Sequence, residues 1–134
     1  MDKNVCAYYR TSSAVNIGSD KDSRKRQHHS VFSYTQSKGL NVVQEFYDRG
    51  VSGTLDVLNR PSFMEMLNYC EDNSIDTIVF ESADRLSRDL IIMETGFQYL
   101  SNLGYKLISV SSPDSFIEDT PTSTMIRQVL GVIS

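Results

Sequence analysis

The chain contains few of the residues that mark several classes of protein. Among its 134 residues there are no Trp, two Cys and three Pro. No Cys/His set has the spacing of zinc ligands, and Cys6 and Cys70 are expected to be small buried residues rather than a disulfide. No apolar run is long enough to cross a bilayer, and the first residues lack a signal-peptide pattern. We therefore expect a cytoplasmic protein without a membrane partner.

Basic residues are outnumbered by acidic ones, 13 Lys and Arg against 17 Asp and Glu. The formal net charge is −4 and the pI is near 5.1, which argues against strong binding of nucleic acid by this chain alone. A hydrophobic content of 40% and a charged content of 22% are ordinary for a globular protein. The length suits one domain over residues 1–134, large enough to bury a core.

Short apolar runs alternate with segments of helical period along the chain. Strands are predicted at Val5–Tyr9, Val42–Tyr47, Ile75–Glu81 and Lys106–Val110. Helices are predicted at Ser23–Lys38, from Arg60-Pro61 with a stripe of Phe63, Met66, Leu67 and Cys70, and after the third strand with a stripe of Leu90, Met93, Phe97 and Leu100. Residues 111–121 are polar and predicted to be mobile. This alternation indicates an α/β fold with a mostly parallel central sheet flanked by helices.

The last segment, Thr122–Ser134, predicts a helix with an unusual apolar surface. Its apolar residues, from Met125 to Ile133, form two adjacent stripes, and one sheet cannot cover both. We expect a truncated helix that serves partly as an interface between identical subunits. The alternative is a deeply buried terminal helix.

Two polar motifs begin where predicted strands end. Arg10-Thr11-Ser12 follows the first strand, and Asp84 to Asp89 follows the third. Open α/β sheets bind ligands at these strand ends. Guanidinium groups pair with phosphate through two parallel charge-assisted hydrogen bonds. The motifs therefore predict attack on a phosphodiester by a serine.

Ser12 is the candidate nucleophile. If the backbone stays extended after the first strand, Arg10 and Ser12 point to the same face, so that Arg10 can bind a phosphate oxygen while Ser12 Oγ attacks phosphorus. The alternative is that Ser12 caps a helix or lies in a turn. Ser13 competes with it from sequence alone, although its side chain would face the other way.

Asp84, Arg85 and Arg88 form a compact acidic and basic set. In the first turn of a helix Arg85 and Arg88 are neighbours that can converge on one anion. Asp84 has two candidate roles, orienting an arginine or giving a proton to a leaving alkoxide. The alternative is that Asp84 caps the helix while the arginines are solvated. Arg60, just before Pro61, can supply a further charge.

Other polar residues carry weaker predictions. Arg24-Lys25-Arg26 is the one basic cluster, which a solvated helix face explains as well as a DNA contact. His28 and His29 are taken as surface residues because no carboxylate partner is evident. Asp48 has no acidic neighbour beside it, so no metal site is predicted.

Five motifs in this order resemble the catalytic domain of serine site-specific recombinases, the resolvase/invertase family, and are most similar to the large serine integrases and transposon recombinases. The motifs are Tyr8-Tyr9-Arg10-Thr11-Ser12-Ser13, Gln27, Tyr47-Asp48-Arg49-Gly50-Val51-Ser52-Gly53, Arg60-Pro61 and Asp84-Arg85-Leu86-Ser87-Arg88-Asp89.

The resemblance implies a role for each matching residue. Ser12 would form a phosphoserine link to the 5′ end of cut DNA, and Asp84 would be the active-site acid. The active-site arginines would be Arg10, Arg60, Arg85 and Arg88, and the supporting positions Tyr8, Gln27 and Ser52. The reaction would need no metal, ATP or other cofactor, because the serine ester conserves the energy of the phosphodiester.

The resemblance also implies partners. They are double-stranded DNA at specific recombination sites and further copies of the chain, in a dimer or tetramer formed through the Met125–Ile133 helix. DNA-recognition domains would follow that helix and are absent from this chain, which makes an acidic net charge tolerable. Two other classes stay open: a metal-dependent nuclease with Asp48 and Glu81 or Asp84 as ligands, and a flavodoxin-like binding module.

Overall fold

A computed structural model describes residues 3–12, 18–113, 115–116, 124–125 and 128–129, with the side chains of 18–22 left out. The elements in chain order are β1 (Asn4–Thr11), α1 (Gly18–Lys38), β2 (Asn41–Arg49), the 3-10 turn η1 (Val57–Asn59), α2 (Pro61–Asp72), β3 (Thr77–Phe80), α3 (Ala83–Leu86), α4 (Leu90–Asn102) and β4 (Lys106–Ser109).

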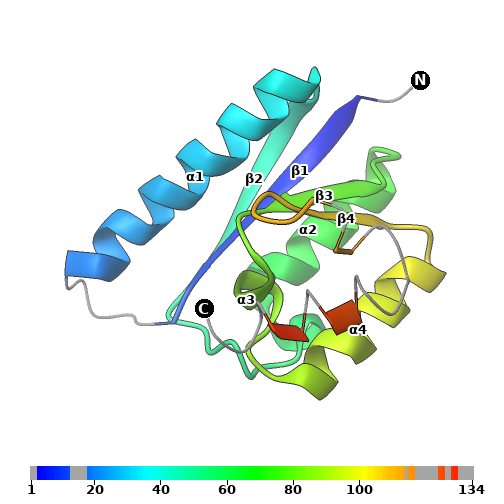
Figure 1. Ribbon diagram of the computed structural model, residues 1–134. Coiled ribbons are helices and arrows are strands. Elements are labelled where there is room, and N and C mark those ends of the chain that lie inside the picture. Colours follow the sequence, from blue (N-terminus) through cyan, green and yellow to red (C-terminus); the bar gives the residue numbers. More distant parts are fainter. Residues whose placement is uncertain (1–2, 13–17, 114, 117–123, 126–127, 130–134) are drawn as a thin grey trace.

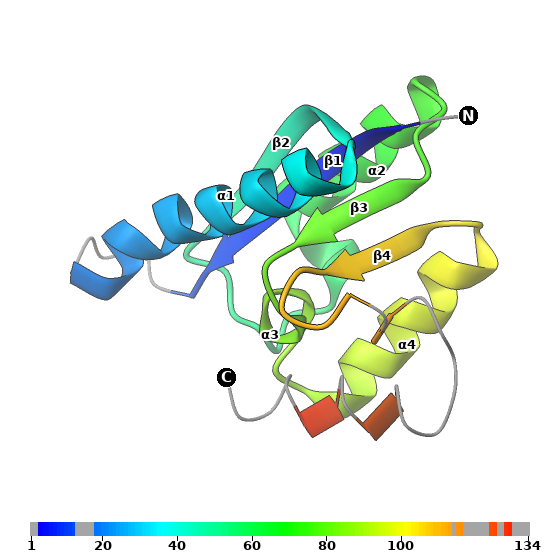
Figure 2. The same cartoon turned by 45° about the horizontal axis from the view of Figure 1, so that its top comes forward.

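The described strands form one parallel sheet in the order β2-β1-β3-β4. Helix α1 covers one face, and α2 and α4 cover the other (Figures 1 and 2). Side chains alternate along β1, so that Tyr8 packs into the cluster under α2 and α4 while Tyr9 packs toward α1. The predicted fold class, a parallel α/β sheet between helical layers, is confirmed.

Strands β1 and β2 run further than their apolar residues predict. Arg10 and Thr11 still pair with Asp48 and Arg49 in the ladder. The prediction that Arg10 and Thr11 follow the first strand is therefore wrong, and β2 continues through Asp48 and Arg49 past its predicted end at Tyr47. The prediction placed the end of each strand at its last apolar residue. In the structure, main-chain pairing continues through polar residues whose side chains have partners of their own.

Helix α1 begins at Gly18, earlier than the predicted Ser23, and packs on the sheet through a largely polar stripe. Among its described side chains, the buried ones are Ser23, Gln27, Val31 and Thr35, whose spacing of four places them on one face. Only Val31 is apolar, so hydrophobic periodicity gives little sign of this packing face.

The two helices on the opposite face agree more closely with the predicted stripes. Phe63, Met66, Leu67 and Cys70 of α2 are all buried. In α4 the predicted stripe holds at Met93, Phe97 and Leu100, but Leu90 is 41% exposed. Leu90 is the first residue of the helix, directly after the cap Asp89, whose carboxylate accepts hydrogen bonds from the amides of Ile91 and Ile92.

Phe116 corrects the prediction of a polar, mobile segment over residues 111–121. It is 2% exposed and packs edge-on against Phe80 and Phe97, with ring centroids 5.4 and 5.6 Å apart. A single aromatic residue in a polar segment has no periodicity, so the pattern could not identify it as part of the core.

Both cysteines are free and buried, as predicted, with their sulfur atoms 3.6 Å apart. In the predicted terminal helix, residues 124–125 and 128–129 are helical, and Met125 and Val129 are 60% and 48% exposed. The rest of Thr122–Ser134 lies outside the described residues. Within the described part of the chain, no helix combines the length and the apolar character needed to span a bilayer.

Helix α4 offers a direct test of the core. Met93 is fully buried, whereas Ile91 on the same helix is 78% exposed. We expect Met93→Ala to lower the free energy of unfolding by about 2–5 kcal/mol, because it leaves a cavity. Ile91→Ala, the matched control, should change it by no more than about 0.5 kcal/mol. Urea denaturation followed by circular dichroism measures both, and equal losses would contradict this placement of α4.

Candidate active site at the carboxyl edge of the sheet

The candidate residues gather at the carboxyl edge of the sheet, between β1 and β3. The chain leaves β1 through α1 toward one side of the sheet, and reaches β3 through α2 on the other face. This is the point where the winding direction of a parallel sheet reverses and a crevice opens outside the strand ends. Arg10 and Thr11 end β1 here, and Asp84 and Arg85 follow β3 in the short helix α3.

The guanidinium of Arg10 is fully buried and bonded to main-chain carbonyls. It donates to the carbonyl oxygens of Asp84 at 2.7 Å, Val51 at 2.8 Å and Arg85 at 3.2 Å. Burial, and then the neighbouring charges of Arg60 and Arg85, lower the pKa of Arg10 to about 10. Arg10 thus joins the end of β1 to two other segments, and its side chain faces inward.

Arg60 has the same character. It is fully buried and donates to the carbonyl oxygens of Leu55 at 2.9 Å, Leu86 at 2.6 Å and Arg85 at 3.1 Å. It also lies 3.3 Å from the hydroxyl of Tyr8. The predicted charge at the start of α2 is therefore present, but it is turned into the protein and bound to the segment after β3.

Tyr8 connects Arg60 to a buried carboxylate. Its hydroxyl donates to Asp48 Oδ2 at 2.9 Å, and burial raises the pKa of Tyr8, so it remains a donor. Asp48 also accepts from the main-chain amides of Ser62 at 2.8 Å and Phe63 at 3.1 Å. Asp48 thereby caps α2 from a neighbouring strand, a role that sequence analysis missed because its partners lie far along the chain.

Arg85 is buried beside α1. Its guanidinium donates to the carbonyl oxygen of Arg10 and to Ser23 Oγ, each at 3.1 Å, and lies 3.5 Å from Glu81 Oε1. Its Nε lies 3.9 Å from Asp84 Oδ2. Within the described residues, this Nε is a buried side-chain nitrogen without a hydrogen-bond partner.

Asp84 is buried between two arginines. Its Oδ2 lies 3.6 Å from Arg88 and 3.9 Å from Arg85, and its Oδ1 accepts a hydrogen bond from Ser82. Helix α3 ends at Leu86, so Arg85 and Arg88 do not share the helical turn that the sequence predicted. They meet at Asp84, with Arg85 buried and the Arg88 side chain 45% exposed. Ser82, not Asp84, occupies the N-cap position of α3.

Ser12 follows β1 in a bend, and its side chain is exposed. The extended backbone that would place Arg10 and Ser12 on one face therefore ends at Thr11. No hydrogen bond joins Ser12 to Arg10, Arg60, Arg85 or Arg88 in the described part of the chain. The chain thus presents an exposed hydroxyl at the edge of a basic site, without direct contact to the arginines.

The loop after β2 closes the site from the other side. Gly53 is buried against Arg10 and Arg88, and a Cβ there would lie 2.9 Å from both Arg10 Nη2 and Arg88 Cγ. The Gly53 carbonyl oxygen accepts a hydrogen bond from the main-chain amide of Arg88 at 2.9 Å. Ser52 is exposed, and its hydroxyl contacts Thr54 Oγ1 at 2.8 Å. Glycine at 53 is what allows this close approach.

Gln27 fixes the main chain at the base of the site. Its amide nitrogen donates to the Arg10 carbonyl at 3.0 Å, and its amide oxygen accepts from the Arg10 amide at 3.2 Å. It also donates to Ser23 Oγ at 3.1 Å. Gln27 thus holds the main chain of Arg10, the residue two before Ser12.

The prediction that His28 has no carboxylate partner is wrong. Its Nδ1 lies 2.5 Å from Glu45 Oε1, and its ring stacks on Phe32. Glu45 lies on β2, 17 residues further along the chain, so the sequence pattern could not indicate its contact with His28. No group of three or more His, Cys, Asp or Glu side chains in the described residues is arranged to hold a metal ion.

Comparison with known proteins gives consistent results. Residues 5–134 match the sequence family described as "Resolvase, N terminal domain". No curated protein matches the sequence. Among solved structures, the N-terminal catalytic domain of TP901-1 integrase is 22% identical with a TM-score of 0.69, over 97% of this chain and 92% of that one.

Two further structures have the same fold. The C-terminal catalytic domain of ISC1926 TnpA, an IS607-like serine recombinase, is 23% identical with a TM-score of 0.66, over 94% of this chain and 78% of that one. A resolvase family site-specific recombinase from Streptococcus pneumoniae is 17% identical with a TM-score of 0.69, over 97% and 86%. With the family match extending from β1 to the last residue, the chain belongs to the resolvase N-terminal domain family, the catalytic domain of serine recombinases.

Proposed function

We propose that this chain cuts and rejoins double-stranded DNA at specific sites, with Ser12 as the nucleophile. The observation that carries the proposal is the exposed Ser12 hydroxyl at the end of β1, beside a site that contains Arg10, Arg60, Arg85 and Arg88. A phosphodiester needs a nucleophile and positive charge that stabilises the oxygens of the pentacovalent transition state. Both lie at this edge of the sheet.

The step balances without a cofactor. Ser12, whose side chain is exposed, gives up its hydroxyl proton to water, the Oγ–P bond forms, and the bond between phosphorus and the 3′ oxygen breaks. The 3′ oxygen takes up a proton from water and leaves as a hydroxyl, so that no net proton is gained or lost, and the 5′ end remains attached to Ser12. Because the product is a phosphodiester of similar energy, the reverse attack by a 3′ hydroxyl rejoins the strand without ATP.

The four arginines divide into two roles in this proposal. Arg10 and Arg60 are buried and bonded to main-chain carbonyls, so they shape the site and supply positive potential. Arg88 is partly exposed, so it is suited to bind a phosphate oxygen, whereas Arg85 is buried and its Nε lies 3.9 Å from Asp84. This assignment replaces the sequence expectation that Arg10 itself binds a phosphate oxygen.

The contacts of Asp84 favour one of its two candidate roles. Two guanidiniums and the Ser82 hydroxyl surround its carboxylate, and these contacts suit Asp84 to orienting Arg85 and Arg88. We therefore propose that Asp84 positions Arg85 and Arg88, rather than acting first as a proton donor.

Ser12→Ala tests the nucleophile. We expect the full-length protein, mixed in EDTA with a plasmid that carries the ends of its element, to form a covalent adduct at the 5′ end of cut DNA. Ser12→Ala should abolish that adduct, because no other atom takes the place of Oγ, and Ser13→Ala should keep it. Denaturing gels measure the adduct. An adduct that survives Ser12→Ala, or cleavage only after magnesium is restored, would contradict the proposal.

Arg88 and Arg60 test the division of the arginines. We expect Arg88→Ala to slow cleavage about 10²–10³-fold, as for loss of a donor to the transition state, with no more than about 0.5 kcal/mol change in stability. Arg60→Met should cost at least about 2 kcal/mol of stability, because buried carbonyls lose their donor. Cleavage kinetics and urea denaturation separate the two. Equal destabilisation by both variants would show that the division is wrong.

A further inference from the structure

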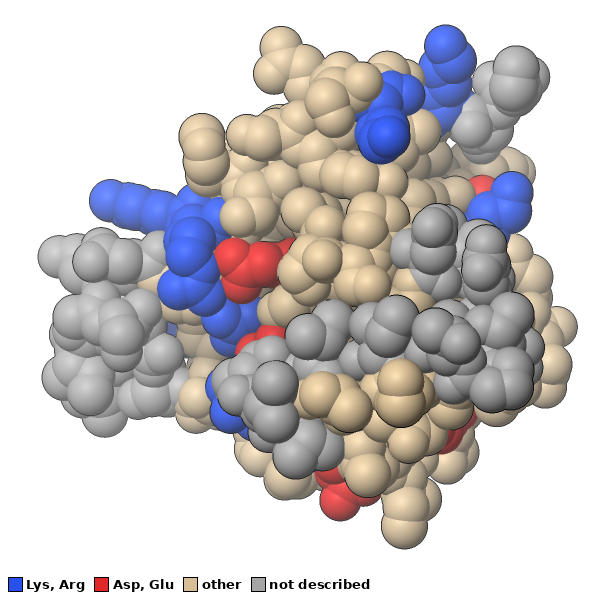
Figure 3. Space-filling model, in the orientation of Figure 1, with Lys and Arg blue, Asp and Glu red and all other residues tan. Residues whose placement is uncertain are grey.

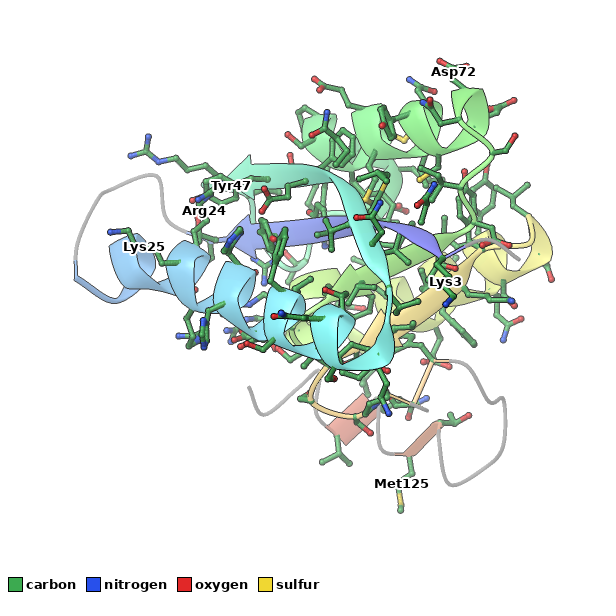
Figure 4. All side chains as sticks on the ribbon, turned by 90° about the horizontal axis from the view of Figure 1, so that it is seen from above. Lys3, Arg24, Lys25, Tyr47, Asp72 and Met125 are labelled. Atoms are coloured by element: carbon green, nitrogen blue, oxygen red, sulfur yellow. The ribbon has the colours of Figure 1, made fainter. Side chains whose placement is uncertain are left out.

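One exposed arginine lies beside the proposed site and has no part in the mechanism above. Arg24 follows Ser23, the residue of α1 that accepts a hydrogen bond from Arg85. Its guanidinium carbon lies 5.5 Å from the ring centroid of Tyr47 and 5.9 Å from that of Tyr9. Figure 4 shows Arg24 beside Tyr47, with Lys25 directed away from both. Two aromatic rings thus hold an otherwise mobile side chain in place.

The rings of Tyr9 and Tyr47, here called the aromatic platform, are connected to the strand end that precedes Ser12. The Tyr47 hydroxyl is hydrogen-bonded to Thr11 Oγ1 at 2.8 Å, and Thr11 is the residue directly before Ser12. Tyr9 is also on β1, and its hydroxyl donates to Glu45 at 2.7 Å. Arg24 is therefore fixed relative to the backbone of β1 rather than to a surface loop.

The guanidiniums of Arg24 and Arg26 have different surroundings. Arg26 makes two hydrogen bonds to Glu81, at 2.9 and 3.1 Å. No ion pair between Arg24 and a carboxylate occurs among the described side chains, and the nearby Glu45 is bound by Tyr9 and His28. In Figure 3, Lys and Arg side chains gather along the first part of α1. A preorganised guanidinium of this kind binds an anion with little loss of conformational entropy.

We propose that Arg24 contacts a backbone phosphate of the DNA beside the one attacked by Ser12, with Tyr47 as the platform that holds it there. The proposal rests on the proposed function, since it takes DNA as the substrate at this edge. An arginine on a rigid platform contributes one phosphate contact that is independent of sequence. It would guide the strand toward Ser12 while taking no part in bond breaking.

The test compares Arg24→Gln with Lys25→Gln, an equal loss of charge on the same helix without the platform. Binding of a fluorescent duplex to the full-length protein is measured by anisotropy over a series of salt concentrations. Arg24→Gln should weaken binding about threefold to tenfold and lower the salt slope by about 1. Lys25→Gln should have less than half of either effect. An unchanged slope for Arg24→Gln, or equal losses for both variants, would overturn the proposal.

Variants of Tyr47 distinguish a phosphate contact from a purely structural role of Arg24. Tyr47→Phe keeps the ring and should keep the binding of DNA, whereas Tyr47→Leu removes the ring and should reproduce part of the loss. If Arg24→Gln lowered only the free energy of unfolding, Arg24 would be a structural residue and the proposal would fail. Ser12→Ala should bind with the normal salt slope. Failure of the phosphate contact is thus distinguishable from failure of the proposed chemistry.

Discussion

The fold around the candidate site depends on buried guanidiniums that are bound by main-chain carbonyls. Arg10 and Arg60 together donate to carbonyl oxygens of Val51, Leu55 and residues 84–86. These acceptors come from the loop after β2 and the segment after β3, which are far apart in sequence. An unpaired buried charge would be strongly unfavourable, so the donors fix the two segments against the end of β1. The shape of the site is a consequence of satisfying two charges.

This arrangement also explains how an acidic chain can hold a basic site. Carbonyl oxygens satisfy the hydrogen bonds of Arg10 and Arg60 but do not neutralise their charge. Of the nearby carboxylates, Asp84 pairs with Arg85 and Arg88, and Glu81 pairs with Arg26 and Arg85. Four arginines, Arg10, Arg60, Arg85 and Arg88, thus gather at one edge of the sheet, although the net charge of the chain is −4. Whole-chain charge is a poor guide to the charge of such a site.

Sequence analysis predicted the sheet, the helices on both faces and the edge at which the polar motifs meet. These predictions held because apolar periodicity reports burial directly, as for Met66 in α2 and Met93 in α4. Sequence analysis did not predict which arginines face inward. Their acceptors are main-chain carbonyls, which every residue has, so no pattern of residue types identifies them. The capping role of Asp48 was not predicted for a related reason, because Asp48 lies on β2 and the helix that it caps, α2, is a separate element.

Helix α1 shows how packing and the site are coupled. A helix with an apolar stripe can shift on a sheet at modest cost, whereas hydrogen bonds have strict distances and directions. Gln27 and Ser23 bind the backbone of Arg10 and the side chain of Arg85, so the position of α1 is set by the site itself. A displacement of α1 would break these bonds and release the strand end that precedes Ser12. The polar face of α1, which weakens its hydrophobic packing, therefore links the helix directly to the geometry of the proposed nucleophile.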